Sequence, residues 1–328
     1  MSRARSLSIL TCLLLAGTAG ATDEQARALL QRMDQAVEAL NYEGTFVHIV
    51  DGQVETMHVV HRVEDGKVTE RLVTLDGPSR EIIRDDQEVT CIFADQKSVM
   101  VERRKGDSPL RAALPRYSEQ LDAYYEFVRL RDGMRLGRNA VSFEIRPRDK
   151  YRYGFRLWMD ESTGMLLKAQ LIDIYRNVAE QLMFVSIRLP ETIAADRVEP
   201  TIETGDFTWY VTQDAAAATA RASASAGGWR AASLPPGFKL TTSNVEMMAG
   251  SEHPTEHLVY SDGIASVSVF IEEPERSSDQ LQGATRIGAA SAFSTMVGGF
   301  QVTAMGEVPP ITVEMIAGSI SGGETAAR

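Results

Sequence analysis

The residues after position 22 carry apolar side chains at helical spacing. In "TDEQARALLQRMDQAVEALN" the apolar positions recur every three or four residues, which places them on one face of a helix. They are Leu29, Leu30, Met33, Val37 and Leu40. The acidic start of the stretch suits the positive end of the helix dipole. The pattern predicts an amphipathic helix whose apolar face must cover another element.

Short strand-like runs separated by turn signals follow this helix. The turn signals are Asp51-Gly52, Asp65-Gly66, Asp76-Gly77-Pro78 and Asp85-Asp86, and an Asp-Gly pair between two such runs is typical of a tight hairpin. The stretch "SEQLDAYYEF", predicted as helical, leads into a second group of strands: "AVSFEIRP", "YRYGFRLWMD", "MLLKAQLID" and "AEQLMFVSIRL". We expect both groups to form one antiparallel sheet.

One face of the second group is almost wholly apolar. Side chains alternate along a strand, so in "YRYGFRLWM" the arginines and Trp158 fall on the opposite face. The apolar row consists of Tyr151, Tyr153, Phe155, Leu157 and Met159, and the next strand continues it with Met165, Leu167, Ala169 and Leu171. A sheet of this many strands must curl toward a barrel or accept a helix across its apolar face. The helix near residues 29–40 is the expected cover.

The composition changes at residue 213. Residues 213–228, "QDAAAATARASASAGG", contain no large apolar side chain and are typical of a linker. After them, residues 229–322 predict a small α+β domain, in which Tyr260-Ser261-Asp262-Gly263 joins two strands as a hairpin. A last helix follows Pro309-Pro310, and the spacing predicts Ile311, Met315 and Ile316 on one of its faces.

The first 21 residues are typical of a cleaved export signal. Arg3 and Arg5 precede an apolar run from Leu7 to Ala16, and Ala19-Gly20-Ala21 follows as a box that suits signal peptidase, so we expect the mature chain to begin at Thr22. The apolar run is shorter than the ~20 residues that a membrane span needs. Cys91 is then the one cysteine left, and a buried structural role is the simplest interpretation in the strand-like run "EVTCIF".

Charge excludes one class of partner. The chain carries a formal charge of −11, and loss of Arg3 and Arg5 with the signal would make it −13. A surface of this sign repels the phosphates of DNA and RNA, so we expect no nucleic acid as a partner.

The histidine pairs do not have the arrangement of a metal site. In a strand, the spacing of three between His58 and His61 places their rings on opposite faces. The pair His253 and His257 is interrupted by Pro254, which would break the helix that an H-E-x-x-H site requires, so a loop leading into a strand is expected there. Zinc needs three or four converging ligands. We therefore predict no metal and no cofactor.

Catalytic motifs are also missing. The sequence has no G-x-S-x-G, no phosphate-binding glycine loop with lysine, and no C-x-x-C. These absences lower the expectation of an enzyme without excluding it, because catalytic residues can converge from distant positions.

Eight segments, in order along the chain, resemble one family, the periplasmic sigma-factor regulators called RseB or MucB. They are "LNYEGTFVH", "LDGPSREIIR", "LDAYYEFV", "PRDKYRYGFRLWMD" with "TGMLLKAQLID", "LPPGFKL", "LVYSDGIASVSVFIE" and "GEVPPITVEMIAGSI". The resemblance covers nearly the whole mature chain. The departures fall in the linker, in residues 94–110 and after Glu275.

The resemblance implies an α+β protein in the periplasm. Its large domain, residues 22–212, would be a half-open antiparallel β-barrel covered by helices, like the lipoprotein carriers LolA and LolB. Its smaller domain, residues 229–322, would bind the periplasmic part of a single-span anti-sigma factor of the RseA or MucA kind. The family is not enzymatic. Binding shields the anti-sigma factor from the site-one protease, and lipid or a lipopolysaccharide fragment is expected to release it.

The resemblance and the patterns together suggest two sets of site residues. The lipid cavity is predicted along Tyr153, Phe155, Leu157, Met165 and Leu167, and the anti-sigma contact at Tyr260, Asp262, Gly263 and Phe270. A second copy of the chain is a further candidate partner. A periplasmic lipid or lipoprotein carrier is the main alternative function and a hydrolase the next, although a simple carrier would not need the second domain.

Overall fold

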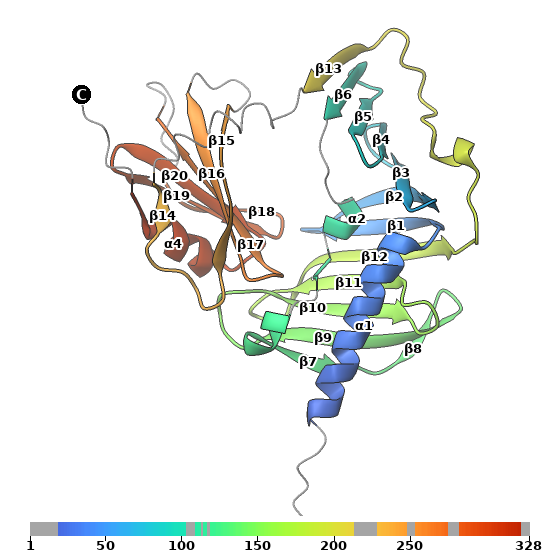
Figure 1. The fold of residues 1–328 in the computed structure, drawn as a ribbon, viewed down its shortest axis with the longest axis horizontal. Coiled ribbons are helices and arrows are strands. Elements are labelled where there is room, and N and C mark those ends of the chain that lie inside the picture. Colours follow the sequence, from blue (N-terminus) through green and yellow to red (C-terminus); the bar gives the residue numbers. More distant parts are fainter. Residues whose placement is uncertain are drawn as a thin grey trace, which may run out of the picture.

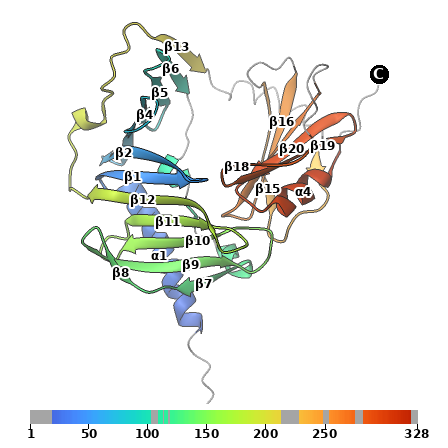
Figure 2. The same cartoon turned by 180° about the vertical axis from the view of Figure 1, so that it is seen from behind.

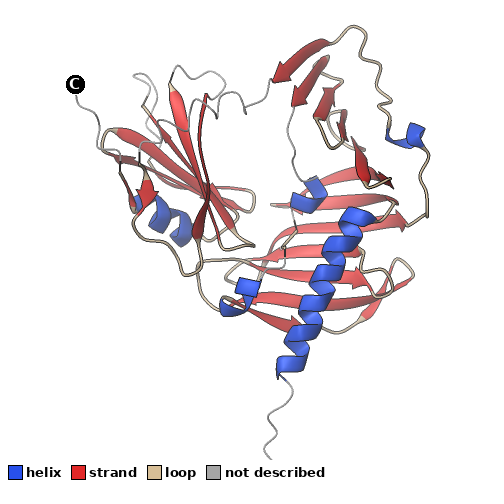
Figure 3. Cartoon of the chain, in the orientation of Figure 1, coloured by secondary structure: helices blue, strands red, loops and turns tan. Residues whose placement is uncertain are grey.

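The computed structural model describes residues 19–102, 109–112, 114–116, 119–212, 228–247, 253–274 and 282–322. It consists mainly of strands, in two large sheets built from successive parts of the chain (Figures 1 and 3). Most of the predicted export signal and of the predicted linker lies outside the described residues. Among the described helices, none is long and apolar enough to cross a membrane.

The larger sheet has thirteen strands and does not close. Its order is β13-β6-β5-β4-β3-β2-β1-β12-β11-β10-β9-β7, with β8 on β9. In chain order the strands are β1 (Tyr42–Val50), β2 (Gln53–Glu64), β3 (Lys67–Thr74), β4 (Arg80–Arg84), β5 (Val89–Phe93), β6 (Ser98–Glu102), β7 (Tyr125–Arg129), β8 (Gly133–Arg135), β9 (Arg138–Pro147), β10 (Gly154–Asp160), β11 (Leu166–Ile172), β12 (Val178–Arg188) and β13 (Thr208–Thr212). The prediction of a wholly antiparallel sheet is wrong at one edge, because β13 pairs with β6 in parallel.

Two of the predicted hairpins are present and have the expected geometry. Asp51 and Gly52 join β1 to β2, and Asp65 and Gly66 join β2 to β3. All four residues have positive φ, between 50° and 76°, as a type I′ turn requires. Asp tolerates this conformation and Gly adopts it without steric cost. The Asp-Gly pairs therefore fix the register of the first three strands.

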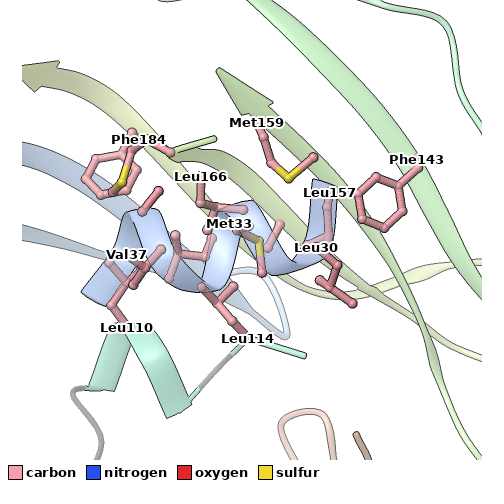
Figure 4. Close-up of a cluster of buried hydrophobic side chains, with 14 of the residues drawn as sticks. Leu30, Met33, Val37, Leu110, Leu114, Phe143, Leu157, Met159, Leu166 and Phe184 are labelled. Carbon is pink, nitrogen blue, oxygen red and sulfur yellow. The ribbon is translucent and has the colours of Figure 1, made fainter. Parts of the chain in front are cut away.

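The helix α1 (Ala19–Ala39) crosses the larger sheet, as its amphipathic pattern predicts. Figure 4 shows Leu30, Met33 and Val37 of α1 turned toward side chains of the sheet. They share one buried cluster with Leu157, Met159, Leu166 and Phe184, to which the short helix α2 (Pro109–Ala112) adds Leu110. This cluster is the core of the large domain.

The apolar row along β10 and β11 shifts where the register slips. Leu157 pairs with Ala169, but Met159 pairs with Leu166 because of an irregularity between Trp158 and Met159. Leu166 therefore joins the core cluster in place of the predicted Leu167. A bulge of this kind inserts one residue and reverses the alternation beyond it. A sequence pattern that assumes regular alternation of side chains along a strand could not predict this bulge.

The stretch predicted as helical before the second group of strands divides in two. Its first part is a short 3₁₀ helix, η1 (Glu119–Ala123), and the rest begins β7. Tyr125 and Phe127 alternate with exposed Glu126 and are buried in the core cluster. Their burial against α1 and β9 outweighs the helical tendency of the preceding residues.

The small domain has a six-stranded sheet in the order β15-β16-β17-β20-β19-β18. The strands are β15 (Lys239–Met247), β16 (Pro254–Ser261), β17 (Ser266–Glu272), β18 (Gly283–Ile287), β19 (Ala290–Val297) and β20 (Phe300–Gly306). Two further strands, β14 (Arg230–Ala231) and β21 (Ile320–Ser321), form a separate antiparallel pair, so the beginning and the end of the small domain's chain lie side by side. In both views the small domain stands beside one end of the large sheet (Figures 1 and 2).

The last helix, α4 (Pro310–Gly318), packs on the small sheet with a face that includes the predicted Ile316 but is otherwise different from the predicted one. The buried side chains are Thr312, Val313, Ile316 and Ala317, whereas Ile311 and Met315 are only half-buried. Thr312 reaches past its own domain, because its hydroxyl donates to the backbone oxygen of Tyr151 at 2.7 Å. A contact with the other domain thus sets which face is covered.

Candidate functional site

The two domains meet at the tip of the β16–β17 hairpin. Asp262 lies in this tip, and one of its carboxylate oxygens, Oδ2, accepts hydrogen bonds from Arg152 Nη1 at 2.6 Å and from the Tyr125 hydroxyl at 2.9 Å. Neither the Arg152 nor the Asp262 side chain has any exposed surface. A fully buried pair of this kind is strongly destabilised when one partner is removed, because the remaining charge is left without compensation.

The Arg152 guanidinium is enclosed by aromatic rings from both domains. It lies 4.9 Å from the ring centroid of Tyr124, 5.4 Å from that of Tyr125 and 5.3 Å from that of Phe238. Such contacts favour a cation over the ring face. Arg152 also binds Asp149, at 3.0 Å, and the backbone oxygen of Pro236, at 2.5 Å.

The other oxygen of Asp262, Oδ1, holds the hairpin tip in shape. It accepts from the backbone N–H groups of Ile264 and Ala265, both at 2.8 Å. Gly263, between Asp262 and Ile264, has a φ of 104° that suits glycine. This turn directs the Ile264 side chain away from the small domain, so that it packs against the core cluster of the large domain.

Gly237 brings the backbone of the small domain close to Tyr124. Its φ is +86°, and a Cβ there would lie 2.4 Å from Tyr124 Cε2. A larger residue would push the ring out of its place over Arg152. The motif "LPPGFKL" therefore contributes a close backbone approach at the domain contact.

A groove of about 410 Å³ runs between the two domains. Its large-domain wall is Tyr153, Phe155 and Leu171, and its small-domain wall includes Ile264, Phe270 and Met305. Tyr153 and Leu171 form a small buried cluster with Ala289 of the small domain. The groove is mainly apolar and follows the domain boundary.

A second cavity, of about 460 Å³, opens on the same side of the large sheet as α2. Its apolar lining is Phe46, Met57, Ile82, Leu110 and Leu182, and its polar groups are His48, Glu55, Arg80, Glu180 and Glu307. Glu307 belongs to the small domain and also lines the interdomain groove. An apolar cavity with a few convergent polar groups has the general form of a small-ligand site.

The polar groups of this cavity interact across the domain boundary. His48 Nε2 lies 2.6 Å from Glu180 Oε1, and this hydrogen bond raises the pKa of His48 although burial opposes the shift. Part of the Glu307 side chain reaches solvent. Burial of the Glu307 carboxyl group and, to a smaller degree, the nearby Glu180 carboxylate raise its pKa to about 7. Glu307 is therefore close to half-ionised at neutral pH.

The structure divides the five residues predicted to line a lipid cavity. Tyr153 and Phe155 line the interdomain groove. Leu157 and Met165 have no exposed surface and lie in the sealed core, and Leu167 is also buried. The row is thus mostly core, and only its end next to the small domain borders a space that a ligand could enter.

The four residues predicted to contact an anti-sigma factor lie on one hairpin but differ in exposure. Tyr260 is buried and its hydroxyl accepts from the backbone N–H of Ala231 at 2.8 Å, while Asp262 is bound to Arg152 and Tyr125 within the chain. Gly263 is exposed. Phe270 is half-buried, stacked on His257 at 4.5 Å and part of the groove wall. A role in partner binding stays a prediction, which Gly263 and Phe270 fit best.

Sequence patterns gave no indication of Arg152, Tyr125, Ile264, His48 or Glu307 as parts of one region. Their contacts join residues more than 100 positions apart, such as Arg152 with Asp262. The one local signal was "SDG", which predicts a tight turn but not where its carboxylate binds.

The histidines lie as predicted with respect to the sheet faces, except that His257 stands inside β16 and not in a loop. His61 is buried, stacks on Tyr42 at 4.4 Å and donates from Nδ1 to the backbone oxygen of Leu40, at 2.9 Å. Its burial lowers its pKa to about 4. His58, on the other face, lies 3.3 Å from Glu43. In the described ranges no three His, Cys, Asp or Glu residues gather as metal ligands would.

Two family models match the chain, and together they span most of it. The MucB/RseB N-terminal domain matches residues 25–202, and the MucB/RseB C-terminal domain matches residues 223–321. These ranges correspond to the large sheet with α1 and to the small sheet with α4.

Similar proteins with curated names extend over nearly the same length. The sigma factor AlgU regulatory protein MucB of Pseudomonas aeruginosa is 33% identical over 296 residues, which is 89% of each chain. The sigma-E factor regulatory protein RseB of Escherichia coli is 25% identical over 332 residues, 97% of each chain.

Solved structures agree with the sequence matches. The structure of the Pseudomonas aeruginosa MucA/MucB complex contains a chain that is 30% identical, with a TM-score of 0.70, over 92% of this chain and 100% of that one. A structure of MucB by itself matches with a TM-score of 0.60 and 30% identity over 93% of this chain and 99% of the other. The chain belongs to the MucB/RseB family.

Proposed function

We propose that this chain is a periplasmic regulator that binds the periplasmic part of a single-span anti-sigma factor and so restrains an envelope-stress sigma factor. The observation that carries this proposal is the match of both domains, over almost the whole length, to a MucB chain solved in complex with MucA(peri). Relatives of similar length are named as sigma factor regulatory proteins. The proposal assigns no catalysis, metal or cofactor to the chain.

The bound anti-sigma segment would be shielded from the site-one protease. Binding protects a peptide from proteolysis when it removes the extended conformation that a protease needs, or covers the cleavage site. The hairpin β16–β17 and the helix α4 carry two of the segments most similar to the family, so residues 229–322 are the expected docking unit. Of the predicted contact residues, Gly263 and Phe270 are accessible enough to take part.

Lipid would release the anti-sigma segment. The spaces that support this part are the interdomain groove, with Tyr153 and Phe155 in its wall, and the cavity next to His48 and Glu307. An open sheet crossed by one helix is also what a carrier domain of the LolA/LolB kind requires. A ligand shifts the arrangement of two domains only if it binds one arrangement more tightly. A ligand in the groove touches both domains and meets that condition.

The direct test is a binding and protection assay with the anti-sigma factor encoded next to this protein. Its tagged periplasmic segment should retain the mature chain, residues 22–328, and should resist the site-one protease when the mature chain is present. A chain of residues 22–212 should still fold, because it contains the complete large sheet, but should give no protection. Full protection by residues 22–212, or no binding by the mature chain, would contradict the proposal. Size-exclusion chromatography of the same samples tests for a homo-oligomer.

A periplasmic lipid or lipoprotein carrier is the second candidate, and the cavity of about 460 Å³ favours it. A carrier should move a labelled lipid from donor to acceptor vesicles at a rate proportional to its concentration. A regulator should bind lipid without net transfer. The transfer assay therefore separates the two functions even if both proteins bind lipid.

A further inference from the structure

The tip of the β16–β17 hairpin has the chemistry of a charged amphiphile. Its anionic head is the Asp262 carboxylate, which lies 2.6 Å from Arg152 and 2.9 Å from the Tyr125 hydroxyl. Two residues further on, its aliphatic part is Ile264, which is half-buried and packs against the apolar core cluster of the large domain. The head and the apolar part thus enter one region of the large domain from the same turn.

The large domain alone supplies most of the receiving site. Arg152, Tyr124 and Tyr125 all belong to it, and so does Asp149, which holds Arg152 at 3.0 Å. The small domain adds Asp262, Phe238 and the oxygen of Pro236. If the hairpin withdraws, Arg152 Nη1 and the Tyr125 hydroxyl lose their anionic partner. Solvent can then reach Arg152, which keeps Asp149 as a partner, and an incoming carboxylate or phosphate can restore the charge-assisted hydrogen bonds that Asp262 made.

We propose that this site on the large domain, made by Arg152, Tyr125 and the adjoining end of the core, binds an anionic amphiphile in competition with the hairpin tip. The carboxylate or phosphate of the ligand takes the place of the Asp262 carboxylate, and the start of its acyl chain takes the place of Ile264. This inference rests on the proposed lipid response and names the ligand class and the contact that the ligand breaks.

Competition at this site explains how a ligand would separate the domains. The hairpin tip supplies the buried ion pair and an apolar contact between the domains, and both are lost together when a ligand occupies the site. The groove wall formed by Tyr153, Phe155 and Leu171 lies next to Ile264. A chain longer than the Ile264 side chain would therefore continue into a space that is already apolar.

The site should select amphiphiles by the charge of the head group. A neutral amphiphile with the same chain would fill the place of Ile264 but leave Arg152 Nη1 without its anion. Charge-assisted hydrogen bonds are about twice as strong as neutral ones. Laurate should therefore bind more tightly than dodecanol, by roughly tenfold or more.

The test measures laurate binding to the full mature chain by calorimetry, with Ile264→Ala as the informative variant. Shortening Ile264 weakens the internal competitor without touching the charged pair, so laurate should bind roughly tenfold or more tightly, since each methylene contributes about 0.8 kcal/mol. Ile287→Ala is the matched control, because Ile287 is exposed on β18 of the same domain. It should leave the affinity unchanged. A short-chain phosphatidylglycerol, tested in parallel, distinguishes a phosphate head from a carboxylate.

Asp262→Asn is a second variant, which acts on the charged pair itself. It keeps the shape of the turn but weakens the bond to Arg152, so it should also raise the affinity for laurate, and small-angle X-ray scattering should show a larger radius of gyration without any ligand. Equal affinities of wild type, Ile264→Ala and Asp262→Asn would overturn the inference, as would equal binding of laurate and dodecanol.

The same variants separate this inference from the proposed lipid response. If laurate binds in competition with the hairpin but leaves the anti-sigma segment bound, the site stands and the proposed release by lipid fails. If lipid releases the anti-sigma segment with the same midpoint in wild type and Ile264→Ala, the release stands and this site is refuted.

Discussion

At the scale of single residues, burial decides which side chains respond to solution conditions. The pKa values of His61 and Glu307 shift in opposite directions because burial disfavours the charged form of each group, which is a cation for His61 and an anion for Glu307. Neither shift could be predicted from the sequence. The two His61 neighbours that matter most, Tyr42 and Leu40, come from a different strand and from the end of α1.

His61 should make the large domain sensitive to acid. Its pKa is about 4 in the folded chain, against an ordinary 6.5. As the pH falls from about 6.5 to about 4, the unfolded chain binds a proton that the folded chain excludes, so the free energy of unfolding decreases, by up to roughly 3 kcal/mol. Denaturant unfolding at several pH values measures this loss.

His61→Phe keeps a ring against Tyr42 and removes the titrating group. We expect it to cost about 1 kcal/mol at pH 7, from the lost hydrogen bond to Leu40, and to flatten the pH dependence between 6.5 and 4. His253→Gln, at an exposed position, should retain the wild-type slope. An unchanged slope in His61→Phe would assign the acid sensitivity to other groups.

At the scale of elements, the sequence was most informative at tight turns and where apolar side chains recur at a regular spacing. Asp51-Gly52 and Asp65-Gly66 fix the hairpins because few residues tolerate a positive φ. On β10 the predicted row holds through Met159, which lies in the core cluster with Leu157, but on β11 it fails at Leu167 because a register slip depends on the partner strand. The buried face of α4 could not be predicted, since Thr312 is drawn to Tyr151 of the other domain.

The position of two residues along the β10 row leads to opposite expectations for the same substitution. Leu157→Glu places a charge in the sealed core and should cost several kcal/mol, enough to unfold the large domain in most conditions. Phe155→Glu places the charge at the wall of the interdomain groove, where solvent can reach it. Circular dichroism melts compare the two variants directly.

Phe155→Glu should stay folded and lose the response to lipid while it still binds the anti-sigma segment. If Leu157→Glu also stays folded with a similar melting temperature, the core around Leu157 must be open to solvent. A folded Phe155→Glu variant that still responds to lipid would place the acyl chain in the cavity near His48.

At the scale of the whole molecule, the domain contact combines the charged hairpin tip with apolar contacts such as that of Ala289 with Tyr153 and Leu171. Besides the hairpin tip, the groups that face Glu307 across the boundary are His48, Glu180, Glu55 and Arg80, which line the same cavity. Ionisation of Glu307 adds a negative charge next to Glu180. The strength of the domain contact should therefore depend on pH near neutrality.

We expect the contact to weaken as the pH rises through about 7. The folded chain holds the Glu307 proton up to that pH, whereas a carboxyl group in water loses it near 4.5, so the closed arrangement loses stability between these values. Small-angle X-ray scattering at pH 6 and pH 8 should show a larger radius of gyration at pH 8. Glu307→Gln should abolish the difference, and Glu314→Gln, at an exposed position on α4, should preserve it. The same change with pH in Glu307→Gln would refute the assignment.

The parallel strand β13 has a consequence for the order in which the large domain folds. It pairs Thr208 with Ser98, residues about 110 positions apart, whereas the neighbours of β6 on its other side are local. Contacts between distant residues close long loops and form slowly. The strands β4, β5 and β6 must therefore wait, with the outer edge of β6 unpaired, until the end of the large domain is available to pair with it. A free sheet edge is a site for misassembly during that interval, so the speed with which β13 arrives sets how long the newly made chain is exposed to that risk.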